Sequence, residues 1–194
     1  MAEEGMKLLK LDKSHLEYMR LPPRLWRVTP DKIPESVQPV FRRFLRDLEE
    51  RMTHGPTVLL MGDPFVGKSA MAALACKRAR QLRKTVQFFR LWEYRALRRN
   101  NEPFDIETSI VSRCMDVELL VFDDLTEDDA NDSWYGLKDL LGLIRTRSDS
   151  LLTTIITTRL SEQSPVIAHI VDSVSPLFAL HVEGPSQQDW MEED

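Results

Sequence analysis

The chain has 194 residues, enough for one domain with a short extension and too few for a second full domain. No apolar run is long enough to cross a bilayer, and the net charge of −5 argues against nucleic acid coating the whole surface. The two cysteines lack CxxC spacing and suggest neither a disulfide framework nor a zinc site. The N-terminus lacks the features of a secretory signal, so we expect a cytoplasmic protein without a membrane partner.

The first part of the chain is predicted to lead into a folded domain. Residues 1–34 are interrupted by prolines and show little periodicity, apart from one short helix near 13–20. Apolar residues then recur at helical spacing through 35–52, which predicts an amphipathic helix. A Gly-Pro pair ends this helix, and the apolar run 57–61 predicts a buried strand.

Helices and strands alternate through the rest of the chain. We expect helices at 68–83, 91–99, 106–115, 133–147 and 162–171, and strands at 85–90, 118–122, 151–157 and 177–182. This alternation predicts an α/β fold, a three-layer sandwich with a mainly parallel five-stranded sheet covered on both faces. We therefore divide the chain into a lead-in (1–34), one α/β domain (35–183) and an acidic, disordered tail (184–194).

A phosphate-binding motif follows the first of these strands. The sequence GDPFVGKS at 62–69 matches GxxxxGK[ST] in full and lies between a buried strand and a helix, as a P-loop must. Its glycines let backbone amides face the phosphates, Lys68 reaches the β and γ phosphates, and Ser69 supplies a hydroxyl to Mg²⁺. A glycine-rich turn that binds nothing is the alternative, and the full motif in this context argues against it. With ATP and Mg²⁺ as ligands, the expected binding residues are Gly62, Asp63, Pro64, Phe65, Val66, Gly67, Lys68, Ser69 and Ala70.

Two acids follow the strand predicted at 118–122. Asp123 is expected to hold Mg²⁺ together with Ser69, and Asp124 to orient and polarise the attacking water. A solvated acidic turn is the alternative, since more acids follow at 127–129. Consecutive carboxylates at the end of a buried strand, in a chain that also has a P-loop, favour the catalytic interpretation.

The strand predicted at 151–157 leads into two hydroxyl residues and an arginine. Thr157, Thr158 and Arg159 fall at the edge where open α/β sheets bind ligands. Either threonine could bind the γ-phosphate or the attacking water, as a sensor 1 residue does, or both could serve only as β-branched strand residues. Both interpretations stay open. The candidate catalytic residues are Lys68, Asp123, Asp124, Thr157 and Thr158.

Aromatic and basic residues alternate between 88 and 99. This combination binds single-stranded nucleic acid through stacking and phosphate neutralisation. The alternative is that the aromatic rings pack in the core and the arginines form a solvated helix face. The candidate DNA-binding residues are Arg90, Trp92, Arg95, Arg98 and Arg99.

In their order, the P-loop, the aromatic-basic helix, the LLVFDD strand and the IITTR strand resemble the DnaC/IstB type of AAA+ P-loop ATPases over residues 35–183. The segment LPPRLW at 21–26 resembles the stretch just before that family's ATPase core. The resemblance implies an ATPase that loads a replicative helicase onto single-stranded DNA, or assists a transposase or recombinase. It also implies nucleotide-dependent homo-oligomers.

Two positive charges of that family are missing from this sequence. The stretch 171–176, where the family has its arginine finger, is VDSVSP, and 184–188, where it places the basic sensor 2 residue, is GPSQQ. Loss of both predicts slow hydrolysis, or a trans arginine supplied by Arg145, Arg147 or Arg159.

Three functions therefore remain open at the level of sequence. The first is a replication or mobile-element ATPase that loads or remodels a replicative helicase. The second is a nucleotide-switched adaptor or inhibitor that binds a helicase or recombinase and hydrolyses little ATP. The third, a small-molecule kinase, is disfavoured because no arginine-rich lid follows the helix predicted at 133–147.

Overall fold

A computed structural model describes residues 11–100, 110–127 and 137–184, apart from the side chains of residues 99 and 100. Predicted features at 1–10, 106–109, 128–136 and 185–194, which include the acidic tail and most of the sensor 2 stretch, lie outside the described residues. Within the described ranges, no helix is both long enough and apolar enough to cross a membrane.

The described residues form one parallel sheet of five strands in the order β2-β3-β4-β1-β5. Strands β1 to β5 are Thr57–Met61, Val86–Arg90, Leu119–Leu125, Thr153–Thr158 and Leu177–His181. The predicted α/β architecture is confirmed, and the sheet is parallel throughout.

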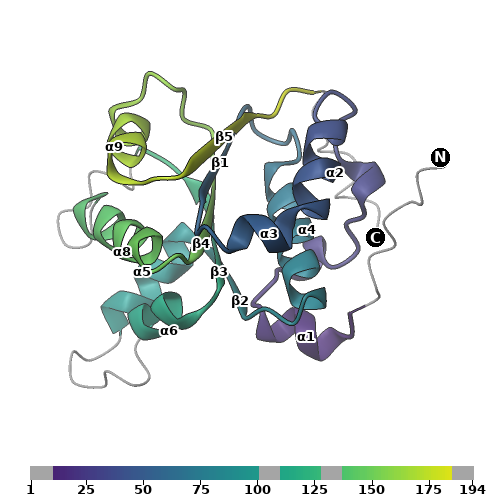
Figure 1. Ribbon diagram of the computed structural model, residues 1–194, viewed down its shortest axis with the longest axis horizontal. Coiled ribbons are helices and arrows are strands. Elements are labelled where there is room, and N and C mark those ends of the chain that lie inside the picture. Colours follow the sequence, from purple (N-terminus) through teal and green to yellow (C-terminus); the bar gives the residue numbers. More distant parts are fainter. Residues whose placement is uncertain (1–10, 101–109, 128–136, 185–194) are drawn as a thin grey trace.

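Helices cover both faces of this sheet (Figure 1). On one face lie α1 (Lys13–Tyr18), α2 (Gln38–Arg46), α3 (Leu48–Met52) and α4 (Lys68–Gln81). On the other lie α5 (Leu91–Asn100), α6 (Ile110–Asp116), α8 (Leu137–Asp149) and α9 (Pro165–Ser173). Successive residues of a strand pack alternately in the hydrophobic cores on the two faces of the sheet. Leu60 packs on the first face and Leu59 on the second. Strands buried on both faces read as continuous apolar runs, which explains the TVLLM sequence of β1.

The structure corrects several predicted boundaries. The single helix predicted at 35–52 is two helices, because the chain leaves helical geometry at Asp47, which ends α2 and precedes α3. Aspartate competes for nearby backbone groups and favours such junctions over helix interiors. The helix predicted to begin at 162 begins at Pro165, where the Ser164 side chain accepts a hydrogen bond from the amide of Val166.

The lead-in packs onto the first face of the sheet and shares its core. Met19, Leu21 and Leu25 are all at most 2% exposed, although the sequence between them shows little periodicity. The amide of Phe88 in β2 donates to the carbonyl of Met19 at 2.9 Å, so the lead-in backbone pairs with the edge of the sheet. The lead-in therefore has a fixed position relative to the strand ends.

A fully buried arginine joins α8 to the sheet. Arg147 donates to the hydroxyl of Thr154 at 3.0 Å, to the carbonyls of Val117 and Thr153 at 2.9 and 2.7 Å, and to the carbonyl of Cys114. Burial lowers the pKa of its guanidinium to about 10. Because Arg147 is 0% exposed, its proposed role as a trans arginine is wrong.

We expect Arg147→Ala to lower the free energy of unfolding by at least ~3 kcal/mol. The substitution removes the donor from several buried oxygens, and each unsatisfied buried acceptor costs about 1 to 3 kcal/mol. Urea denaturation followed by circular dichroism measures the change. Arg145→Ala, on the exposed side of the same helix, should cost less than about 0.5 kcal/mol, and equal losses for the two variants would contradict the assignment.

Candidate nucleotide-binding site

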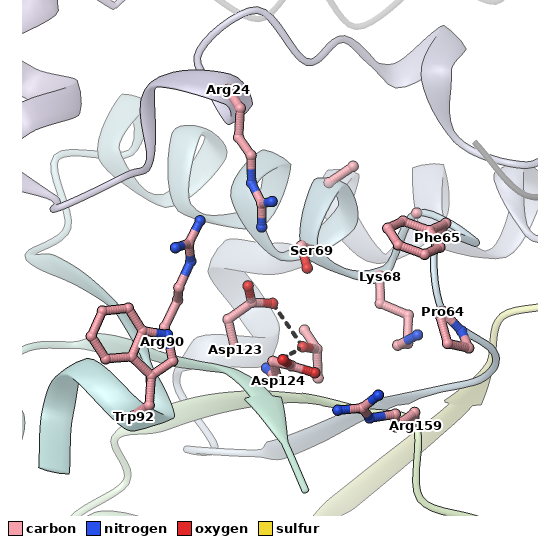
Figure 2. A pocket seen from close by; sticks show the side chains of 13 residues that line it. Arg24, Pro64, Phe65, Lys68, Ser69, Arg90, Trp92, Asp123, Asp124 and Arg159 are labelled. Atoms are coloured by element: carbon pink, nitrogen blue, oxygen red, sulfur yellow. Dashed lines mark hydrogen bonds between the residues drawn. The ribbon is translucent and has the colours of Figure 1, made fainter. Parts of the chain in front are cut away.

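A cavity of about 360 Å³ opens at the carboxyl ends of the strands, where α/β sheets bind ligands. Strands β2, β3 and β4, the loop between β1 and α4, and the start of α4 each contribute to its wall (Figure 2). The described lining residues are Arg24, Pro64, Phe65, Gly67, Lys68, Ser69, Ala70, Arg90, Trp92, Asp123, Asp124, Thr157 and Arg159. Most of the sequence-predicted site residues thus lie together.

The loop from Gly62 to Gly67 requires glycine at both ends. Gly62 has φ +144, and a Cβ there would lie 2.2 Å from the carbonyl oxygen of Val182. Gly67 has φ +98 and is the N-cap of α4, which begins at Lys68. Only glycine adopts such angles at low cost, so the two glycines permit the tight passage from β1 to the N-terminus of α4. A helix N-terminus entered in this way is a site for phosphate.

The ammonium of Lys68 lies inside the cavity against its own loop (Figure 2). Its Nζ donates to the carbonyl oxygens of Gly62 at 2.8 Å and Asp63 at 2.6 Å. Burial lowers the pKa of Lys68, and the carboxylates of Asp124 and Asp123 oppose that shift. The cavity therefore contains a cation and two anions close enough to influence one another.

A threonine hydroxyl connects the two acids. Thr157 in β4 donates to Oδ1 of Asp123 at 2.7 Å and accepts from the backbone amide of Asp124 at 2.9 Å. Burial raises the pKa of the Asp123 carboxyl, which is 1% exposed, while hydrogen bonds from Ser69 and Thr157 act in the opposite direction. Asp123 is thus held between the helix after the P-loop and the neighbouring strand.

Both acids line one cavity because β3 is irregular at that point. Successive strand residues normally face opposite sides of a sheet. Here β3 continues to Leu125, beyond the predicted end at 122, and its register with β4 shifts between Phe122 and Leu125. Asp124 has φ +65, a left-handed conformation, and it is exposed while Asp123 is buried. The bulge turns the second acid back toward the cavity.

The two threonines at the end of β4 have different environments. Thr157 lines the cavity, whereas Thr158 is buried and donates to the carbonyl of Leu125 at 2.7 Å. The same Thr158 hydroxyl accepts from the amide of Leu160 at 3.0 Å. Of the two candidates, the structure brings only Thr157 to the site, and Thr158 stabilises the strand end.

The five candidate DNA-binding residues separate into two groups. Arg90 and Trp92 line the cavity, and Trp92 is 59% exposed. Arg95 and Arg98 lie further along α5 outside the lining, and Arg98 pairs with Asp139 at 3.4 Å. The side chain of residue 99 is outside the described part of the chain.

Sequence reasoning did not include Arg24 among the site residues. Arg24 belongs to the short 3-10 helix Pro23–Leu25 of the lead-in and lines the cavity together with residues of the P-loop. The local sequence offers no chemical motif at this position. The resemblance of the LPPRLW segment to the family is the only sequence feature that includes Arg24, and it does not indicate a role for this side chain.

Several solved structures with this architecture are helicase-loader or replication-initiation proteins. The structure of DnaI superposes with a TM-score of 0.68 and 15% identity, covering 91% of this chain and 100% of that one. The DnaC helicase loader superposes with a TM-score of 0.58 and 19% identity over 84% of this chain and 100% of its own. The chain has the fold of DnaI and of the DnaC helicase loader. No protein-family model matches the sequence, and no curated protein matches it.

The same fold occurs in a replication initiator. DnaA bound to AMPPCP and single-stranded DNA superposes with a TM-score of 0.65 at 12% identity over 86% of this chain. The chain spans 53% of that DnaA chain and 50% of the chain of a similar DNA replication initiation factor. At such low identities the likeness concerns the fold, and the roles of individual residues depend on the geometry of this cavity.

We predict that Asp123→Asn raises the thermal stability of the protein free of nucleotide and metal. Burial raises the pKa of this carboxyl, so its contribution to stability is present below the unfolded pKa and is lost as the pH rises through the folded pKa. Asparagine removes the charge and keeps an oxygen that accepts from Thr157. Differential scanning calorimetry in EDTA at pH 7 should show an increase of a few degrees, since 1 kcal/mol shifts Tm by about 2 to 4 °C at this size.

Glu127→Gln is the matched control, because it removes an exposed negative charge from the same segment. Its Tm should stay within about 1 °C of the wild-type value. A lower Tm for Asp123→Asn than for the control would contradict the destabilising effect of the buried charge.

Proposed function

We propose that the chain binds ATP with Mg²⁺ in this cavity and hydrolyses it. One observation carries the proposal: the buried carboxylate of Asp123 receives hydrogen bonds from Ser69 and Thr157 in the same cavity as Lys68 and the P-loop glycine Gly67. A phosphate-binding helix N-terminus, a lysine and a strand-end acid together are the recurring parts of P-loop NTPase sites.

The donor atoms near Asp123 suit Mg²⁺. The hydroxyl of Ser69 and the carboxylate of Asp123 are hard oxygen ligands, and they are already adjacent. A bound cation would also offset the cost of burying the Asp123 charge, which is expressed in its raised pKa. When bound, Mg²⁺ neutralises charge on the β and γ phosphates.

Three residues of the site then have distinct roles. Lys68 exchanges its bonds to the loop carbonyls for bonds to the β and γ phosphates. Asp124 lies exposed in the cavity and orients the attacking water, whose proton its carboxylate accepts. Thr157 is a positioning residue, because it contacts Asp123 and the backbone of Asp124 and so fixes the separation of the two carboxylates.

The cellular role that we propose is the loading or remodelling of a replicative helicase on single-stranded DNA in the cytoplasm. The support is the fold shared with the DnaC helicase loader and DnaI, and with a DnaA that binds AMPPCP and single-stranded DNA. We propose nucleotide-dependent homo-oligomers as the active form. A transposase or recombinase is the alternative partner.

Single-stranded DNA would contact the chain at Trp92 and Arg90. An exposed indole beside a guanidinium provides both base stacking and phosphate neutralisation. Since both side chains line the cavity of Lys68 and Asp123, DNA at this position would lie against the nucleotide. Arg95, Arg98 and the residue at 99 would take part only as the continuation of the same helix.

A second candidate is the nucleotide-switched adaptor with little hydrolysis. The observation in its favour concerns the three candidate trans arginines. Arg147 is buried and Arg159 lines the chain's own cavity, which leaves only Arg145 of the three to reach a neighbouring subunit. If Arg145 supplies a trans contact, the ATPase rate per subunit rises with protein concentration, and in the adaptor it does not.

Lys68→Ala should abolish ATP binding, because the β and γ phosphates lose their cation. Asp124→Asn should retain binding and lose hydrolysis by about 100-fold or more, since the group that orients the water can no longer accept its proton. Titration with a fluorescent ATP analogue and a phosphate-release assay measure the two effects. Normal turnover by either variant would disprove the catalytic assignment.

The oligomer and the DNA contact can be tested together by analytical ultracentrifugation with a non-hydrolysable ATP analogue and a labelled single-stranded oligonucleotide. We expect nucleotide-dependent oligomers that take up the DNA. Trp92→Ala should weaken the uptake about tenfold without preventing assembly, because base stacking on an aromatic ring contributes ~1 to 3 kcal/mol. A wild-type protein that stays monomeric and ignores DNA would favour the adaptor.

A further inference from the structure

The lead-in supplies a guanidinium to the part of the cavity that Ser69 and Asp123 line. Arg24 lines the same cavity as Ser69 and Asp123, and its positive charge acts on the Asp123 carboxyl. Figure 2 shows the Arg24 side chain directed from the 3-10 helix of the lead-in toward Ser69 and Asp123. An arginine outside the motifs therefore faces the two residues that suit Mg²⁺.

No competing contact within the described part of the chain holds this guanidinium. Arg24 takes part in none of the hydrogen bonds or ion pairs among the described residues, and its side chain is exposed. Arg98 and Arg147, by contrast, are bound to a carboxylate and to backbone carbonyls. The donors of Arg24 are thus available to a ligand in the cavity.

The backbone around Arg24 is anchored to the helix that begins at the P-loop. Lys77 in α4 donates from Nζ to the carbonyls of Trp26 at 2.8 Å and Val28 at 2.9 Å. The indole of Trp26 donates to the carbonyl of Leu21 at 2.7 Å, which closes the segment into a compact turn. Helix α4 contains both Lys68 and Lys77. The contacts of Lys77 therefore fix the position of the Arg24 backbone relative to the P-loop.

We propose that Arg24 binds the terminal phosphate of ATP in cis and so links the lead-in to the nucleotide state. The inference rests on the proposed function. Ser69 and Asp123 would hold the magnesium ion that offsets the charge of the terminal phosphates, so a guanidinium facing these residues would face that end of the nucleotide. A guanidinium forms paired, charge-assisted hydrogen bonds with phosphate oxygens. Arg24 thereby supplies a positive charge that the stretch 171–176 lacks.

Release of the γ-phosphate would remove this contact and leave the lead-in held by its bonds to Lys77 and the sheet. With ATP bound, the lead-in is therefore attached to the domain by one more contact than with ADP bound. A partner that binds the lead-in can in this way distinguish the two states without touching the nucleotide.

The test compares the affinities of Arg24→Ala for a non-hydrolysable ATP analogue and for ADP, both with Mg²⁺, by isothermal titration calorimetry. We expect affinity for the analogue to fall about 10- to 100-fold and affinity for ADP to change less than about threefold, since the contact involves the γ-phosphate. Arg24→Lys should recover part of the loss, because it keeps the charge without the fork. Arg27→Ala, which removes a charge three residues away outside the cavity lining, should bind both nucleotides as the wild type does.

Hydrogen exchange of the backbone amides of residues 24–28 gives a readout that a purely structural role would not move. The wild type should protect these amides more with the ATP analogue than with ADP, and Arg24→Ala should lose the difference. An equal loss of affinity for both nucleotides, or no loss for either, would overturn the assignment of Arg24. A wild-type protein that binds neither nucleotide would instead overturn the proposed function and this inference with it.

Discussion

The hydroxyl of Thr157 joins two neighbouring strands at the place where one of them becomes irregular. At the bulge of β3 the amide of Asp124 loses its regular ladder position, and Thr157 accepts its hydrogen bond. The same hydroxyl donates a hydrogen bond to the carboxyl of Asp123. One oxygen therefore fixes the backbone of the exposed acid and the side chain of the buried one. Without it, a partly buried amide and a buried carboxylate would each lose a partner, and the relative placement of the two acids would no longer be set.

Helix α4, which packs on the first face of the sheet, connects this arrangement to the lead-in. Ser69 in its first turn bonds to Asp123, and Lys77 holds the carbonyls of the lead-in. Burial lowers the pKa of Lys77 to about 8, because removing the charged ammonium from water is unfavourable. The helix thus connects the strand-end acids with a segment about 40 residues earlier in the sequence than the P-loop lysine.

The parts of the site that are contiguous in sequence could be predicted, and the parts that depend on packing could not. The P-loop and the apolar strand before Asp123 are local patterns with a defined chemistry, so sequence alone located them. The choice between Thr157 and Thr158 depends on the alignment of β4 with a bulge in β3, which no local pattern encodes. Arg147 resembles a solvated residue of an amphipathic helix, yet it is buried because several carbonyls converge on it. Arg24 reaches the cavity only through the tertiary path of the lead-in.

The left-handed backbone at Asp124 restricts which amino acids can evolve there. Among residues with a side chain, aspartate and asparagine enter this region at the lowest cost, because their short polar groups can bond to the local backbone. Glutamate offers the same carboxylate on a longer stem but has no such compensation. The bulge therefore favours the shorter acid independently of catalysis, and glutamate in its place would carry a higher cost in backbone conformational energy.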